Sequence, residues 1–334
     1  MSDQVDTRSG ALRGFLAAGG ARNGGLVLAL LLLCVVGWVT AGDRFASVQN
    51  LVVVLGLAAI TGVLSIGMTF VITSGGIDLS VGSVLGLASV WASTVATQSM
   101  AREIGWIVMV VCALAVGLGA GLVNGILVAY GRVVPFIATL AMLVAARGLA
   151  ELIANRRTQL VDVPSFEAAF RGNVLGVPKI VWIFAAVAAA GWFLLARTTF
   201  GRRTVAIGGN VEAARLAGIK VKRHTASLYA LAGLTSGIGA VMMLARTDAG
   251  SSTNGTLMEL DAIAAVVVGG TLLAGGRGTI VGTVLGVLIF TTLTNIFVIN
   301  NLNSSVQAVA KGAIIVAAVL LQQRFAAREG ASGA

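Results

Sequence analysis

Residues 51–73 read LVVVLGLAAITGVLSIGMTFVIT, an apolar run without a charged side chain. A helix needs about 20 apolar residues to cross the hydrocarbon core of a membrane, so this stretch predicts a membrane-spanning helix. The whole chain has the same character. Of its 334 residues, 57% are apolar and only 11% are charged, against roughly 25% charged in soluble proteins. This composition excludes a soluble enzyme, a nucleic-acid-binding protein and a disordered scaffold. It predicts an all-α fold, a polytopic membrane helix bundle.

The same length criterion, applied along the whole chain, predicts about ten membrane spans. We expect them near 24–41, 51–73, 79–97, 105–129, 135–155, 179–196, 225–245, 261–274, 279–299 and 305–322. The segments 261–274 and 279–299 are separated by glycines, and they fit either two short spans or one re-entrant hairpin.

Lysine and arginine residues set the expected orientation, because cytoplasmic loops of membrane proteins carry an excess of both. With the N-terminus inside, roughly twice as many of these residues fall on the cytoplasmic side as outside. We therefore expect both termini in the cytoplasm, with tails at 1–23 and 323–334 around a transmembrane domain at 24–322. A cleaved signal peptide ending near Thr40-Ala41-Gly42 is disfavoured, because a long polar segment with both charge signs precedes it.

One segment of the chain occurs twice. GGIDLSVGSVLG at 75–86 returns as GGRGTIVGTVLG at 275–286, with seven of twelve positions identical. This indicates either an internal repeat, which is common in transporters, or chance similarity between two Gly/Val/Leu-rich helices. Glycines four residues apart, as at Gly117, Gly121 and Gly125, predict faces on which neighbouring helices pack closely.

Residues 197–224 form the most informative cytoplasmic loop. Asn210 is a good N-cap, Glu212 lies in the first turn, and Gly218 is a natural terminator, so VEAARLA at 211–217 predicts a two-turn helix. The basic residues on both sides keep this helix out of the membrane. It fits a docking element for a cytosolic partner, or a basic loop that happens to be helical.

Four stretches of this sequence resemble one family. GGIDLSVG at 75–82 resembles a motif of the permease subunits of sugar-type ABC importers, the ribose, xylose and arabinose group. GLVNG at 121–125, the run at 200–219 and ELDAIAAVVVGGT at 259–271 resemble the same family. The resemblance covers about residues 45–322. It departs from the family pattern where the glutamate directly follows Val211, which bears on the choice of ATPase partner.

The resemblance implies a role for the 210–218 helix and a set of partners. The helix would be the coupling helix that sits in a cleft of the ATP-binding subunit, with contact residues Asn210, Glu212, Ala213, Ala214, Arg215, Leu216 and Gly218. The implied partners are a second permease chain in a homodimer, two cytosolic ABC ATPase domains and a periplasmic or lipid-anchored sugar-binding protein. The implied location is the bacterial cytoplasmic (inner) membrane.

The sequence predicts no catalytic site and no cofactor of its own. It contains no G-x-x-x-x-G-K-[ST] phosphate loop, so ATP and magnesium are expected on the partner ATPase. His224 has no cysteine or carboxylate cluster beside it, so no metal site is expected. Cys34 and Cys112 lie in apolar segments and indicate no disulfide framework.

Polar residues within membrane spans are expensive and are therefore candidates for function. Asp78 begins a helix, where it fits a cap better than a substrate contact. Arg147 and Glu151 are four apart and predict a structural ion pair, and Lys311 fits a side chain that extends to the membrane surface. The candidate residues of the substrate pathway are Asp78, Ser80, Asn124, Phe136, Thr139 and Asn295, with helix-to-helix hydrogen bonding as the alternative for the polar ones. The candidates for docking a binding protein are Arg156, Arg157, Arg171 and Arg246.

Three other functions compete with sugar import. A permease of the same fold could carry another small solute, such as a branched-chain amino acid or a nucleoside. An ion-coupled secondary transporter would need no ATPase, but it normally needs more membrane carboxylates than Glu151 alone. A membrane enzyme is disfavoured, because no paired carboxylates or nucleophile–base arrangement occurs at membrane depth.

Overall fold

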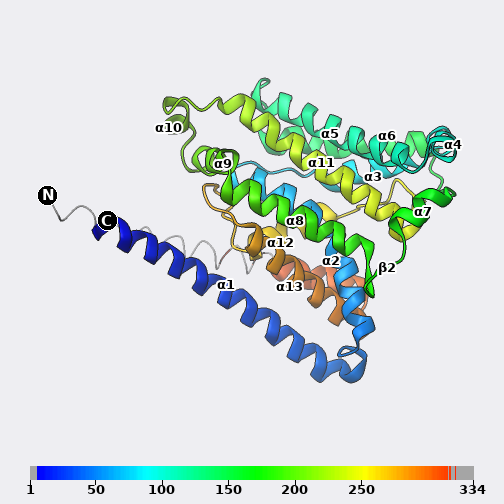
Figure 1. Ribbon diagram of the computed structural model, residues 1–334, viewed down its shortest axis with the longest axis horizontal. Helices are drawn as coiled ribbons and strands as arrows, with labels where there is room; N and C mark the ends of the chain where they lie inside the picture. Colours follow the sequence, from blue (N-terminus) through cyan, green and yellow to red (C-terminus); the bar gives the residue numbers. More distant parts are fainter. Residues whose placement is uncertain (1–5, 315, 317–319, 321–334) are drawn as a thin grey trace.

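The computed structural model describes residues 6–314, 316 and 320, with side chains from Asn23 onward. It is a bundle of helices that run side by side from one end of the molecule to the other (Figure 1), which confirms the predicted all-α membrane bundle. Within the described residues, 7 helices are long and apolar enough to cross a membrane. The first runs from Asn23 in α1 Asp6–Ala41 through the following turn to Arg44. The others are α2 Val48–Thr73, α5 Ile107–Ala129, α6 Pro135–Ala154, α8 Lys179–Arg197, α11 Val221–Thr247 and α13 Ile280–Ile299.

Shorter elements connect these helices. They are the 3-10 turn η1 Gly42–Arg44 and the helices α3 Val81–Ala92, α4 Val95–Ile104, α7 Pro164–Phe170, α9 Thr199–Gly209, α10 Val211–Leu216 and α12 Met258–Val268. Strand β1 Gln159–Leu160 pairs antiparallel with β4 Ala249–Gly250, and β2 Asn173–Val174 pairs antiparallel with β3 Val177–Pro178. Residues 304–314 are also helical.

The prediction of a continuous span at 79–97 is wrong. The chain there forms α3, which has 12 residues, and then α4, with a break at Ser93 and Thr94. A helix of that length is about 18 Å long, against a hydrocarbon core of about 30 Å. The Thr94 hydroxyl causes the break, because it accepts a hydrogen bond from Thr97 N and caps the start of α4.

The prediction of a span at 261–274 is also wrong. The helix there is α12, with 11 residues, and the ten residues before it are largely irregular. We call residues 249–257 the strap. The strap runs back along α3, since Gly250 contacts Ser93 at one end and Gly255 contacts Gly82 at the other. The strap and α12 together thus take the place of one continuous span, and α13 follows as a full span. This arrangement is neither of the two expected for 261–299.

The ends of the chain can be compared with the expectation only in part. Helix α1 begins at Asp6, within the segment expected as a tail at 1–23, but its membrane-spanning part begins at Asn23, close to the expected start at 24. Of the span expected at 305–322, only 305–314, 316 and 320 are described. The tail expected at 323–334 lies outside the described residues.

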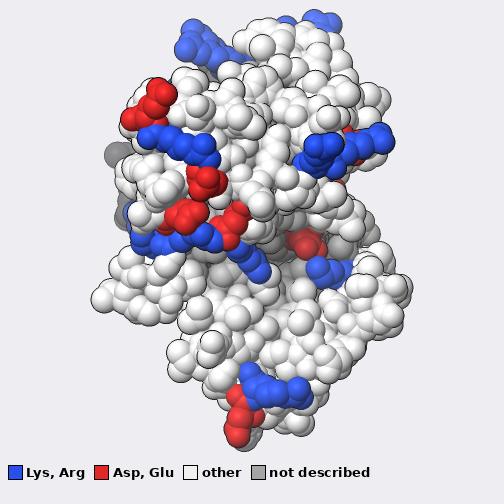
Figure 2. Space-filling view, turned by 90° about the vertical axis from the view of Figure 1, so that its right-hand side faces the viewer, with Lys and Arg blue, Asp and Glu red and all other residues white. Residues whose placement is uncertain are grey.

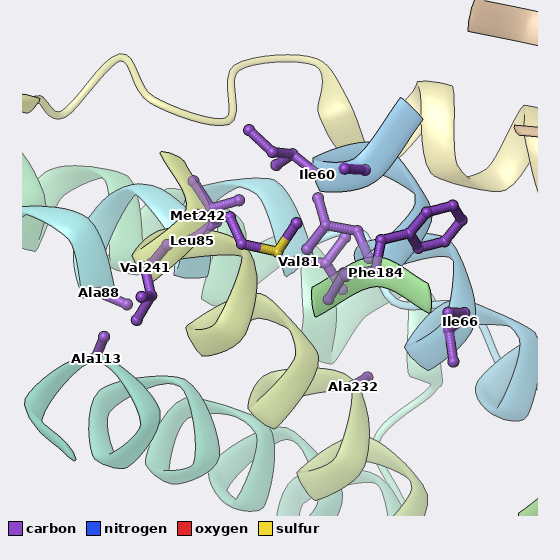
Figure 3. Close-up of a cluster of buried hydrophobic side chains, with 14 of the residues drawn as sticks. Ile60, Ile66, Val81, Leu85, Ala88, Ala113, Phe184, Ala232, Val241 and Met242 are labelled. Atoms are coloured by element: carbon purple, nitrogen blue, oxygen red, sulfur yellow. The ribbon is translucent and has the colours of Figure 1, made fainter. Parts of the chain in front are cut away.

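The core of the bundle lies between α2, α3, α8 and α11 (Figure 3). Leu85 of α3 and Met242 of α11 are fully buried there, and Phe184 of α8 packs on α2 where Gly62 leaves room for its ring. Helix α1 lies at the margin of the bundle (Figure 1), with most of its large apolar side chains exposed. This exposure fits a helix that faces lipid.

The glycines four residues apart on α5 lie against a neighbouring helix, as the sequence predicts. A Cβ at Gly121 would overlap the carbonyl oxygen of Tyr229 on α11, and one at Gly117 would overlap that of Gly233. Gly233 and Gly237 of α11 meet α5 in the same way. The two backbones therefore touch, and the prediction of close helix packing is confirmed.

The two copies of the repeat adopt the same local structure. In each copy an irregular glycine segment leads into a helix, α3 at Val81 and α13 at Ile280. Gly82 of the first copy packs on the strap at Gly255, and Gly282 of the second copy packs on Gly269 at the end of α12. The first copy therefore contacts the strap, and the second copy contacts the end of α12. This agreement favours a true repeat over chance similarity.

Candidate functional site

Three of the predicted site residues meet where the first copy of the repeat leads into α3. Asp78 Oδ1 accepts hydrogen bonds from Ser80 N (2.9 Å) and Ser80 Oγ (2.6 Å). Asn124 Nδ2 of α5 donates to Ser80 Oγ at 2.9 Å. All three side chains are buried. The N-cap residue of α3 is Ser80, and its side chain makes no capping hydrogen bond, so the prediction that Asp78 caps the helix is wrong. Asp78 instead orders the turn before α3 through Ser80, together with Asn124, which the sequence alone does not connect to it.

Of the other pathway candidates, Thr139 lies beside this group. Thr139 Oγ1 of α6 donates to the carbonyl oxygen of Pro135 in its own helix at 2.9 Å, and it lies 3.5 Å from the carbonyl oxygen of Ile77, the residue before Asp78. Asn295 of α13 exchanges two hydrogen bonds with Asn50 of α2, at 3.1 and 2.8 Å. Phe136 is 53% exposed on the outer side of α6. In this conformation Thr139 and Asn295 satisfy polar groups within the bundle, and Phe136 alone faces outward.

We expect Asp78→Ala to destabilise the protein by about 1–3 kcal/mol, because it leaves buried donors of Ser80 without their acceptor. Thermal unfolding of the purified protein in one detergent measures the change. Ser305→Ala is the control, because Ser305 is exposed and its hydrogen bond to Asn303 comes from its backbone N–H, which the alanine keeps. Equal melting temperatures for the two variants would contradict a structural role for Asp78.

The ion pair predicted between Arg147 and Glu151 is wrong. Arg147 Nη1 donates instead to the carbonyl oxygens of Ser252 and Asn254 in the strap, the latter at 3.0 Å. Glu151 pairs with Arg156 at 3.5 Å. The strap has irregular backbone inside the bundle, so its carbonyl groups need donors, and Arg147 supplies them. The polar run SSTNG at 251–255 is the signal in the sequence for such an irregular segment. Its partner Arg147 could not be identified from it, because Arg147 lies more than a hundred positions away.

Lys311 also differs from expectation. Its ammonium group does not extend to the membrane surface but binds both carboxylate oxygens of Asp261 on α12, at 3.1 and 3.2 Å. Both side chains are less than one-third exposed. The pair fastens α12 to the helix at 304–314.

Helix α10 has the capping that the sequence predicts. Asn210 Oδ1 accepts a hydrogen bond from Ala213 N at 2.9 Å, and Gly218 ends the turn with a φ of +80°. Glu212 and Arg215 lie on one side of the helix, 3.3 Å apart. Ala214 is buried, Ala213 is exposed, and Leu216 is 89% exposed. An exposed leucine between charged groups is suited to contact another protein.

A cavity of about 530 Å³ separates α10 from the ends of α5 and α6. Gly75 and Gly76 of the first repeat copy line it on one side, next to Ser74, and Arg132, Arg215 and Lys222 line it with positive charge. No acidic residue is among the described side chains that line it. Helix α10 is therefore attached to the bundle through α9 and α11, with open space beside it.

We call the opposite end of the bundle, which carries α4, α7 and the short strands, the α7 end. Figure 2 shows acidic and basic side chains side by side on it. Arg171 pairs with Glu167 at 3.1 Å and with Asp248, and Arg102 pairs with Asp162 at 2.7 Å. Arg157 and Arg246 are exposed, and neither forms an ion pair with any other described residue. Of the four predicted docking arginines, these two are the ones whose charge is unneutralised.

Comparison with known proteins gives a consistent result. Residues 50–319 match the family described as "Branched-chain amino acid transport system / permease component". The chain is 39% identical to the ribose import permease protein of Escherichia coli over 90% of this chain and 92% of that one. It is 42% identical to the ribose import permease protein of Bacillus subtilis over 85% of this chain and 87% of that one. It is 33% identical to the L-arabinose ABC transporter permease protein of Azospirillum brasilense over 90% and 87%. No solved structure matches the chain.

Proposed function

Because this chain belongs to the family of transport-system permease components that it matches over residues 50–319, we propose that it is the permease subunit of an ATP-driven importer of a monosaccharide. It is a transport component and a multi-pass membrane protein. The observation that carries the sugar proposal is the similarity, over nine-tenths of the chain, to an import permease for ribose. The relatives named for ribose and for arabinose handle pentoses, so a ribose-like pentose is the first substrate to test, with hexoses next.

The proposed importer contains two copies of this chain, two cytosolic ATPase domains and a solute-binding protein outside the cytoplasmic membrane of a bacterium. ATP and magnesium bind to the ATPase domains. The exposed face of α10 supports the ATPase contact, because it offers Leu216 and the Glu212–Arg215 pair to a partner. The mixed charges of the α7 end support docking of the binding protein on that side.

The chemistry of the bundle also fits a neutral substrate. Its buried polar groups are mostly hydroxyls and amides, such as Ser80, Asn124 and Thr139, which match the hydroxyl groups of a sugar. Asn124 Oδ1 is buried and accepts no hydrogen bond from any described residue. In the proposed cycle, ATP binding moves α10, the bundle opens around the first repeat copy, and such acceptors meet the sugar.

The test has two steps. The tagged permease is first purified from native membranes in mild detergent, and co-purifying proteins are identified by mass spectrometry. The complex is then reconstituted in vesicles with its binding protein and given radiolabelled ribose, xylose, galactose and leucine. We expect an ABC ATPase in the complex and ATP-dependent uptake of one of the sugars. Uptake of leucine alone would support an amino-acid permease, and uptake driven by an ion gradient without ATPase would contradict the proposal.

Charge reversal at the α7 end tests the binding-protein contact. We expect Arg157→Glu to lower binding-protein-stimulated ATP hydrolysis by about tenfold and to leave basal hydrolysis unchanged, because like charges across an interface slow association. Arg171→Glu is the comparison, since Arg171 is paired within the chain and its reversal should reduce thermal stability as well. If Arg157→Glu lowers basal and stimulated hydrolysis equally, the contact is elsewhere.

A further inference from the structure

The end of α9 touches two other segments by backbone alone. A Cβ at Gly208 would overlap the carbonyl oxygen of Thr73, the last residue of α2, and the backbone nitrogen of Gly276. Those two groups are themselves joined, because Gly276 N donates to Thr73 O at 2.8 Å. Gly208 thus lies directly against the hydrogen bond that links α2 to the turn before α13. No side chain longer than hydrogen fits there.

Both copies of the repeat begin at this contact. A Cβ built on Gly275 would lie 2.9 Å from the backbone nitrogen of Gly75 and 2.9 Å from the carbonyl oxygen of Gly208. The first glycines of the two copies therefore face each other, with the end of α9 against them. A displacement of Gly208 acts on the start of both copies at once.

The start of helix α9 is fixed to α2 and α11. The Phe200 ring packs between the rings of Phe70 on α2 (6.1 Å between centroids) and His224 on α11 (4.5 Å). Thr204 Oγ1 and His224 Nε2 form a buried hydrogen bond of 2.9 Å. The start of α9 is thus fixed to the bundle, and its other end carries Gly208.

A single residue joins α9 to α10. Asn210 is the C-cap of α9 and the N-cap of α10, and its side chain holds the first turn of α10. Such a junction has little freedom to absorb motion. Helix α10 itself stands beside the cavity of about 530 Å³ and has room to move. A force on α10 therefore passes through Asn210 to Gly208, two residues before it.

We propose that Gly208 is a positioning residue for transport, the point at which movement of α10 is passed to the glycine turns that begin both repeat copies. The inference rests on the proposed function, because it takes the partner on α10 to be the ATPase. The absence of a side chain at Gly208 is what brings α9 into contact with Thr73 and Gly276. A methyl group there would push α9 away and weaken the Thr73–Gly276 hydrogen bond.

The chain offers a matched control in the next residue. Gly209 has nothing within 4 Å of the position of its Cβ. Gly208→Ala and Gly209→Ala therefore make the same chemical change on the same helix, with and without the contact. In the reconstituted importer we expect Gly208→Ala to lower uptake per ATP hydrolysed by about tenfold, since overpacking displaces backbone. We expect Gly209→Ala to stay within about twofold of the parent.

A second readout reports on the turn itself and does not depend on which solute is carried. Ser74→Cys places a thiol on the cavity wall beside the first repeat copy, and its maleimide labelling rate is measured in the full complex with ATP and with ADP. We expect a nucleotide-dependent rate in the parent and with Gly209→Ala, and a rate independent of nucleotide with Gly208→Ala. Co-purification of the ATPase should be equal in all three.

The outcomes separate the two proposals. If the complex takes up no sugar but the labelling rate still depends on nucleotide in the parent and not with Gly208→Ala, the substrate proposal fails and this inference stands. A nucleotide-dependent rate that persists with Gly208→Ala, or is missing from the parent, overturns the inference. Should Gly208→Ala fail to fold, Phe200→Leu loosens the same helix, and unchanged nucleotide dependence in that variant overturns the inference as well.

Discussion

Leu216→Asp is expected to detach the permease from its ATPase. Leu216 is 89% exposed at the end of α10, and burying a leucine in a partner is worth about 1.5–3 kcal/mol. Its loss alone weakens binding by about ten- to a hundredfold, and a carboxylate in an apolar pocket adds to the loss. ATP-driven uptake should fall to background. Co-purification of the tagged permease with its ATPase, followed by stimulated ATP hydrolysis, measures both effects.

Leu175→Asp is the matched control for this experiment. Leu175 is 88% exposed at the turn between β2 and β3, at the opposite end of the bundle. The chemical change and the exposure are the same, so an equal loss of the co-purifying ATPase in both variants would be a general effect of the added charge. The assignment of α10 as the ATPase contact fails if Leu216→Asp retains its ATPase as well as Leu175→Asp does.

The second large effect is expected from Gly121→Val in α5. The backbone of α11 occupies the space that the valine side chain would need. To make room, α5 and α11 have to separate, and these two helices form the most extensive helix pair in the bundle. We expect a loss of about 3 kcal/mol or more, at the upper end of overpacking effects. The purified variant should therefore melt at a clearly lower temperature or fail to accumulate.

Gly119→Val in the same helix separates packing from helix propensity. A Cβ at Gly119 would have nothing within 4 Å, so the valine points to open space. This variant should melt within a few degrees of the parent, since surface substitutions are usually worth less than about 0.5 kcal/mol. Equal melting temperatures for the two valine variants would show that α5 and α11 do not pack through this face.

Local chemistry in the sequence was enough to predict α10. Asn210 and Gly218 are capping residues that act within a few positions of each other, so no distant contact is needed to place the helix. The close approach of α5 and α11 could also be predicted, because the spacing of Gly117, Gly121 and Gly125 is a property of one helix face.

The two broken spans could not be predicted by measuring apolar length. The segment 79–97 contains no charged residue and several serines and threonines, and the capping hydroxyl of Thr94 is a weak signal inside such a run. The position of the strap depends on Arg147, and that of α3 on the bond between Asn124 and Ser80. These are contacts between residues far apart in sequence. The spacing of Arg147 and Glu151 suggested a local pair, but Arg147 donates to the carbonyl groups of the strap instead.

The strap has a consequence for how the protein is made. Its sequence at 249–257, AGSSTNGTL, is too polar to enter a bilayer as a separate segment. The backbone carbonyls of Ser252 and Asn254 find their donor only after α3 and α6 are side by side and Arg147 is in place. During biogenesis we therefore expect the strap to wait at the membrane surface after α11 has been inserted. The last steps of maturation are then its entry along α3 and the seating of α12 behind it.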